Sequence, residues 1–154
     1  MTRFYGIDEA NAALPDVERV LLDLRDQRAE LIRLRDAVLA ASKHDGGGRG
    51  EDEAADEAPA SGDDPDARDP EAAAARRLMR LRMQGLIDQM QAGVTRLIER
   101  DVTLREIEAG LIDFPALANG RQIWLCWRLG EGDIEWWHEL DEGFASRRSL
   151  SELT

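Results

Sequence analysis

The sequence contains one cysteine, Cys126, and no long apolar run. A single cysteine cannot form an internal disulfide, and it cannot supply a zinc site built from several thiolates. No apolar segment approaches the roughly 20 residues that span a bilayer, and the first residues lack the apolar stretch of a signal peptide. We therefore expect a cytoplasmic protein that does not bind a membrane.

Basic residues are also scarce, with 20 Lys and Arg against 32 Asp and Glu, which gives a formal charge of −12. The acidity is uneven, because residues 45–71 carry eleven acids and two arginines, a charge of −9, and leave −3 for the rest. Binding to phosphates requires clustered Lys and Arg, which neither portion has. Nucleic acid is therefore excluded as an expected partner.

The length and composition predict one globular domain covering residues 1–154, since 43% of the residues are hydrophobic and 34% are charged. Local patterns divide this domain into four segments. They are a first helix at about 8–42, a disordered acidic linker at about 43–69, a second helix at about 70–100, and a β segment with a C-terminal loop at about 101–150.

The first helix is indicated by Asp8 as the N-cap and by an apolar stripe at steps of three and four residues. That stripe comprises Leu14, Val17, Leu21, Leu24, Leu31 and Val38. Between the helices, residues 43–69 contain no aromatic or β-branched residue. Such a segment cannot offset its ordering entropy, so we expect a disordered linker, with an acidic docking segment as the alternative.

The second helix has a well-specified start, with Asp69 as the N-cap, Pro70 at the first position and Glu71 in the first turn. Its apolar stripe comprises Leu78, Met79, Met83, Leu86, Ile87, Met90, Val94, Leu97 and Ile98. Two stripes of this length favour an antiparallel hairpin of coiled-coil type. They also present more apolar surface than a small sheet can cover, so we expect a homodimer through the helices.

From Arg121 the side chains alternate in the manner of a strand, with Trp124 and Cys126 on one face. A tight turn at Glu131 and Gly132 would pair Trp127 with Trp136 and place Cys126 and His138 on opposite faces of the hairpin. A third strand is expected at residues 111–114 or 102–104, because two strands alone are marginally stable. The predicted class is α+β, with the long helical hairpin packed on a small antiparallel C-terminal sheet of two to four strands.

Residues 136–148 contain one histidine, three carboxylates and two arginines just after a strand. Imidazole and carboxylate groups suit a divalent metal, or a general acid–base pair. The candidate metal ligands are His138, Glu139, Asp141, Glu142 and Asp113. In the alternative interpretation, Glu142 forms an ion pair with Arg147 or Arg148, Asp113 is a cap or turn residue, and Cys126 is a packed thiol.

Four segments resemble a bacterial family, the domain-of-unknown-function 2203 family. They are ANAALP at residues 10–15, GLIDFPA at 110–116, LCWRLGE at 125–131 and WHELDEGFA at 137–145. The resemblance covers nearly the whole chain apart from the acidic linker, which therefore looks like an insertion. It supports the architecture and implies no activity, substrate or cofactor.

Two functional hypotheses follow from the sequence. In the first, the protein is a binding or interaction module that engages a partner or a second copy through its helices. In the second, it is a small metal-dependent enzyme or a metal- or ligand-binding protein with a site at His138 and the neighbouring carboxylates. The second hypothesis requires those groups to converge around a partly open pocket.

Overall fold

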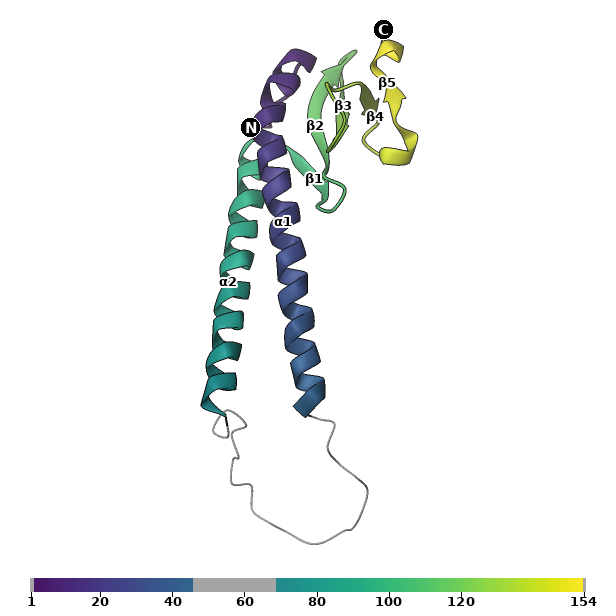
Figure 1. Cartoon of the computed structure of the whole chain (residues 1–154). Helices are drawn as coiled ribbons and strands as arrows, with labels where there is room; N and C mark the ends of the chain where they lie inside the picture. The colour runs from purple at the N-terminus through teal and green to yellow at the C-terminus, as the bar shows by residue number, and fades with distance from the viewer. Residues whose placement is uncertain (1, 46–68, 154) are drawn as a thin grey trace, which may run out of the picture. The chain divides into compact units, whose positions relative to one another are not determined.

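The computed structural model describes residues 2–45 and 69–153, and it has two long helices followed by a five-stranded antiparallel sheet (Figure 1). The predicted α+β class is confirmed, with one strand more than the expected maximum. The residues assigned to the acidic linker lie mostly outside the described ones. Within the described residues, no helix is long and apolar enough to cross a membrane.

The elements follow one another along the chain in a simple order. They are α1 (Ile7–Asp45), α2 (Pro70–Glu99), β1 (Thr103–Glu106), β2 (Leu111–Ala118), β3 (Arg121–Arg128), β4 (Trp136–His138), the 3-10 helix η2 (Phe144–Ser146), β5 (Arg148–Ser149) and the 3-10 helix η3 (Leu150–Glu152).

Both helices start close to their predicted positions. Asp69 Oδ1 accepts hydrogen bonds from the backbone N–H groups of Glu71 at 3.1 Å and Ala72 at 3.2 Å, so it is the predicted N-cap of α2. Helix α1 begins one residue before Asp8, whose carboxylate lies in the first turn and complements the helix dipole instead of capping it. The predicted stripes therefore lie on real helices.

The described chain divides into two compact units, Met1–Arg28 with Asp88–Thr154, and Ala29–Ile87. Among the described residues of the second unit, all except Asp69 belong to α1 or α2. Arg82 on α2 donates to Glu30 on α1 through Nε at 2.8 Å and Nη2 at 2.9 Å, while Leu86 is buried. Leu78 and Leu81, by contrast, are 67% and 69% exposed, so this unit presents apolar side chains to solvent.

In the first unit, one face of the sheet forms the hydrophobic core with the helix ends. The core contains Leu14, Val17, Leu21, Leu24, Leu97, Ile112, Phe114, Ile123, Leu125 and Trp137. Tyr5 packs edge-on against Phe114 with ring centroids 5.0 Å apart, and its backbone N–H donates to the Pro115 carbonyl at 2.7 Å. Because this face is filled, the side chains that alternate with the core residues lie on the other face of the sheet.

The strands occur in the order β1-β2-β3-β4-β5, and each is antiparallel to its neighbour. Asn119 and Gly120 join β2 to β3 with φ angles of 52° and 77°, which brings Ala118 opposite Arg121. An Asn-Gly pair with positive φ at both positions is the favoured two-residue hairpin turn. This turn signal precedes Arg121, where the predicted strand pattern begins, and it was not part of the prediction.

The predicted pairing of β3 with β4 is wrong by one residue. Trp136 lies opposite Cys126, and His138 lies opposite Trp124. Since side chains alternate between faces, a slip of one residue moves every side chain of β4 to the other face. Cys126 and His138 therefore lie on the same face, against the prediction.

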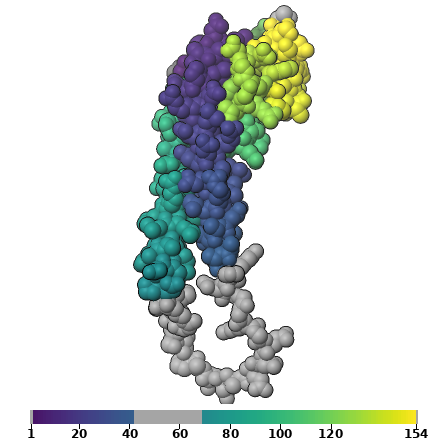
Figure 2. Space-filling model, viewed as in Figure 1, coloured from purple at the N-terminus to yellow at the C-terminus, as the bar shows by residue number. Residues whose placement is uncertain are grey.

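The slip arises because Glu131 and Gly132 do not form a tight turn between the strands. Residues 129–135 make a longer connection, in which the Gly132 carbonyl accepts from Trp127 Nε1 at 2.8 Å. Near its end, the backbone N–H of Ile134 donates to Asn11 Oδ1 on α1 at 2.7 Å. Figure 2 shows this part of the chain, in yellow-green, directly beside the first turns of α1 in purple.

Candidate metal centre

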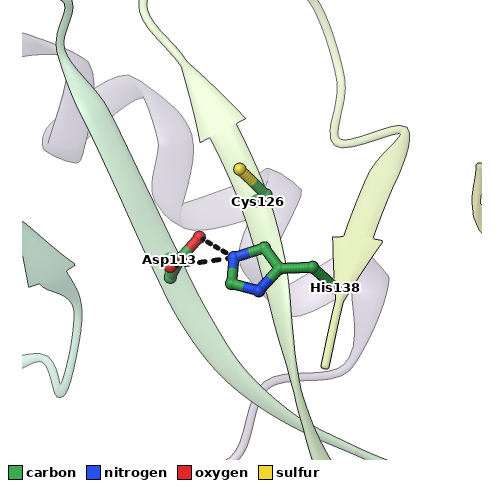
Figure 3. A group of neighbouring side chains, drawn as sticks. All are labelled: Asp113, Cys126 and His138. Atoms are coloured by element: carbon green, nitrogen blue, oxygen red, sulfur yellow. Dashed lines mark hydrogen bonds and ion pairs between the residues drawn. The ribbon is translucent and has the colours of Figure 1, made fainter. Parts of the chain in front are cut away.

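Three neighbouring strands each place one metal-binding side chain on the face of the sheet away from the core. Asp113 comes from β2, Cys126 from β3 and His138 from β4 (Figure 3). Asp113 is directly opposite Cys126, whereas His138 is opposite Trp124. The imidazole therefore reaches diagonally across the central strand to meet Asp113.

The donor atoms of these three residues lie within 4.8 Å of one another. The exposed fractions are 1% for Asp113, 1% for Cys126 and 2% for His138. His138 Nε2 is 3.0 Å from Asp113 Oδ1 and 3.1 Å from Oδ2. A nitrogen, a sulfur and a carboxylate oxygen are thus gathered in a buried position, where polar groups require partners.

A backbone contact fixes the orientation of His138. Nδ1 lies 2.8 Å from the carbonyl oxygen of Glu139, and because a carbonyl oxygen only accepts, Nδ1 carries the hydrogen. The remaining nitrogen, Nε2, faces Asp113. Metal-binding histidines have this arrangement, in which one ring nitrogen donates to a backbone carbonyl and leaves the other for the ion.

Arg105 fixes the orientation of the Asp113 carboxylate. Arg105 Nε donates to Asp113 Oδ2 at 2.8 Å, and the Arg105 guanidinium carbon lies 5.1 Å from the centroid of the Trp124 ring. The hydrogen bond fixes the carboxylate, and the aromatic contact fixes the arginine. Two of the three donors are therefore oriented by groups around them.

The thiol of Cys126 holds its proton strongly. Burial, reinforced by the negative charge of Asp113, raises the pKa of its thiol to about 12, although the nearby Arg147 acts in the opposite direction. Within the described residues, His138 Nε2 faces the Asp113 carboxylate at 3.0 Å and forms no hydrogen bond with the Cys126 thiol, so the geometry does not pair the thiol with a histidine base. The geometry favours a ligand over a nucleophile, because coordination to a metal removes the thiol proton.

A pocket of about 310 Å³ adjoins the three donors. Its lining comprises Arg105, Leu111, Asp113, Cys126, His138, Leu140, Asp141, Glu142, Gly143 and Phe144. The segment after β4 contributes residues 140–144, of which Leu140 is 51% exposed. The buried donors are therefore reached from solvent through a pocket with polar and apolar walls.

The remaining candidate ligands from the sequence have different surroundings. Glu139 pairs with Arg121, whose Nη2 lies 2.6 Å from Glu139 Oε1, and this hydrogen bond lowers the pKa of Glu139. Glu142 Oε1 accepts from Arg148 Nη2 at 2.9 Å, which matches the ion pair of the alternative interpretation. Asp141 is exposed and lines the pocket. The structure thus brings Asp113 and His138 together and directs Glu139 elsewhere.

Cys126 is absent from the predicted ligand set because the predicted β3–β4 register placed it on the face opposite His138. A hairpin turn at Asn119 and Gly120 predicts that Cys126 lies opposite Asp113. With Ala118 opposite Arg121, the antiparallel pairing runs back along both strands to Asp113 opposite Cys126. This pairing depends on a local turn and is readable from the sequence.

A family model described as Uncharacterized conserved protein (DUF2203) matches residues 3–150. The chain belongs to this family. No curated protein and no solved structure matches the chain. The matched range includes all three donors and the pocket, so the candidate centre lies within the part that defines this DUF2203 protein.

Proposed function

We propose that this protein binds one divalent transition-metal ion, of the zinc class, through Asp113, Cys126 and His138. The observation that carries the proposal is the gathering of three different donor atoms within 4.8 Å from three adjacent strands. A thiolate combined with an imidazole favours zinc over magnesium or calcium, which prefer oxygen ligands alone. This proposal reverses the order of the two hypotheses from the sequence.

The proposed centre supports catalysis better than a purely structural role. Structural zinc sites use four protein ligands, whereas catalytic sites use three and keep one position open. Here the three donors adjoin the 310 Å³ pocket, where a small molecule can approach the open position. We propose a metal-dependent hydrolytic enzyme, in which the bound ion would supply Lewis-acid activation of the bond that water cleaves.

Asp141 is our candidate for the general base of that reaction. Glu142, the other acidic residue in the pocket outside the donor set, accepts from Arg148 and from the Glu139 backbone. Asp141 forms no ion pair within the described residues, so its carboxylate is available to accept a proton. Asp141→Asn should reduce turnover without removing the metal.

The metal proposal is tested by elemental analysis and by cobalt substitution. We expect the wild type to bind one equivalent of metal per chain and its cobalt form to show a thiolate-to-cobalt charge-transfer band. Both the metal and the band should be lost in Cys126→Ser and in His138→Gln. Glu139→Gln is the matched control, because it changes a predicted ligand whose side chain pairs with Arg121, and it should retain the metal. Circular dichroism checks that each variant is folded.

The proposal fails if the reduced wild-type protein takes up neither zinc nor cobalt at stoichiometric amounts. It also fails if Cys126→Ser binds cobalt with the same spectrum as the wild type, because sulfur would then not be a ligand. We also propose a cytoplasmic location, in which Cys126 would stay reduced and able to act as the thiolate ligand.

We also propose the homodimer as a second property of the chain. It is supported by Leu78 and Leu81, which lie three residues apart on α2 and are 67% and 69% exposed. Exposed apolar patches on helices are typical of interaction surfaces. This property is compatible with the metal centre, since the two leucines belong to the unit without the sheet.

A further inference from the structure

We infer that Arg105 binds the carboxylate of an anionic substrate next to the proposed metal ion. The inference rests on the proposed function and specifies the class of substrate for that site. It concerns the part of the Arg105 guanidinium group that makes no hydrogen bond within the described residues. Arg105 lines the same pocket as the three donors.

The contacts of Arg105 leave one edge of its guanidinium group available. Its hydrogen bond within the described residues uses Nε, which donates to Asp113 Oδ2 at 2.8 Å. One face of the group is occupied by the Trp124 ring at 5.1 Å. The edge formed by Nη1 and Nη2 remains, and two parallel N–H groups on that edge match the two oxygens of a carboxylate.

The position of Arg105 is also suited to recognition of a ligand. Its side chain is 42% exposed, whereas the side chain of Asp113 beneath it is 2% exposed, so the arginine connects the buried centre with solvent. Two anchored points, Nε and the aromatic face, hold the group in place before a ligand arrives. A preorganised arginine loses less conformational freedom on binding than a mobile one.

The other walls of the pocket restrict the ligand further. Leu111, Leu140 and Phe144 provide apolar surface, and the charge of Glu142 is balanced by Arg148. Arg105 is the only cationic residue of the pocket lining within the described chain. A volume of about 310 Å³ lies at the lower end for small-molecule sites. The expected substrate is a small carboxylic acid with a short apolar body and a second group that coordinates the metal ion.

Two probes that differ in one carboxylate test this inference on the cobalt-loaded protein. Acetohydroxamate binds a metal through its hydroxamate alone, and succinate monohydroxamate carries an additional carboxylate. Changes in the cobalt absorption spectrum report the affinity of each probe. We expect wild-type protein to bind the carboxylated probe roughly 10- to 100-fold more tightly, as one charge-assisted contact provides.

Substitution of Arg105 should remove this preference specifically. In Arg105→Gln the ratio of the two affinities should fall to about 1, and Arg105→Lys should retain a reduced preference because it keeps charge and loses the paired N–H groups. The ratio within each variant cancels any change in metal affinity. Arg82→Gln is the matched control, because Arg82 also donates through Nε to a carboxylate but lies in the other unit. It should leave the ratio unchanged.

The outcomes separate the inference from the proposed function. Equal binding of both probes by the wild type, or a preference that persists in Arg105→Gln, overturns the role of Arg105 and leaves the metal centre intact. If Arg105→Gln does not load cobalt, the ratio of the two probe affinities is measured in Arg105→Lys instead. A ratio in Arg105→Lys equal to that of the wild type overturns the proposed contact between the paired N–H groups and the carboxylate. Failure of the wild type to load cobalt overturns the proposed function itself.

Discussion

Tyr5 connects the start of the chain to the end of α2 through one hydroxyl group. The Tyr5 side chain is buried, and its O–H donates to the Arg100 carbonyl at 2.6 Å. Burial raises the pKa of this phenol above its ordinary value of 10.0. The folded state therefore favours the neutral, hydrogen-bonded form, which couples stability to alkaline pH.

Tyr5→Phe should lower the free energy of unfolding by about 1 kcal/mol at neutral pH, since it removes one hydrogen bond. The stabilisation by Tyr5 is fully present below the pKa of about 10 in the unfolded chain. It is lost as pH rises through the higher folded-state pKa, because the unfolded tyrosine ionises first. Urea unfolding of both proteins between pH 7 and 11 measures this difference. A difference that grows with pH would contradict the assignment.

At the level of the elements, two glycines in turns have similar backbones and different surroundings. Gly110, between β1 and β2, has φ +65°, and Gly120, between β2 and β3, has φ +77°. A Cβ atom at Gly110 would lie 2.5 Å from Leu129 Cβ, whereas one at Gly120 would have no neighbouring atom of the described residues within 4 Å. The β1–β2 turn thus depends on close approach as well as on backbone conformation.

Gly120→Ala should cost about 1 to 2 kcal/mol, which is the penalty of a left-handed conformation for an L-residue. Gly110→Ala should cost about 1 to 3 kcal/mol more, because Leu129 must also move. Thermal or urea unfolding of the two variants gives both values, with Gly120→Ala as the control for strain. Equal losses of unfolding free energy in the two variants would mean that Leu129 moves away from the new methyl group at position 110 without a cost in free energy.

The two strand pairings differ in whether the sequence alone predicts them. Local turn chemistry at Asn119 and Gly120 sets the β2–β3 pairing, so Asp113 opposite Cys126 is derivable from the sequence. The β3–β4 pairing depends on the hydrogen bond from Ile134 to Asn11, residues 123 positions apart. No local pattern specifies such a contact, which explains why the predicted pairing failed.

At the scale of the whole molecule, the proposed homodimer rests on the exposed apolar side chains of α2. Leu78→Lys combined with Leu81→Lys should convert a dimer at micromolar concentration into a monomer, because charged side chains resist burial at an interface. Size-exclusion chromatography with light scattering measures the mass. Leu117→Lys is the control, since Leu117 is 59% exposed on β2 in the other unit. A wild-type protein that is monomeric at these concentrations would contradict the proposal.

The sequence by itself determined the two helices, the cap at Asp69, the alternating strand at β3 and the α+β class. These features depend on interactions between residues close in the chain, where periodicity and capping leave a direct pattern. It also indicated Asp113 and His138 as candidate ligands. The tertiary structure alone decided that His138 lies on the same face as Asp113 and Cys126, because the anchored loop before β4 sets the register of that strand.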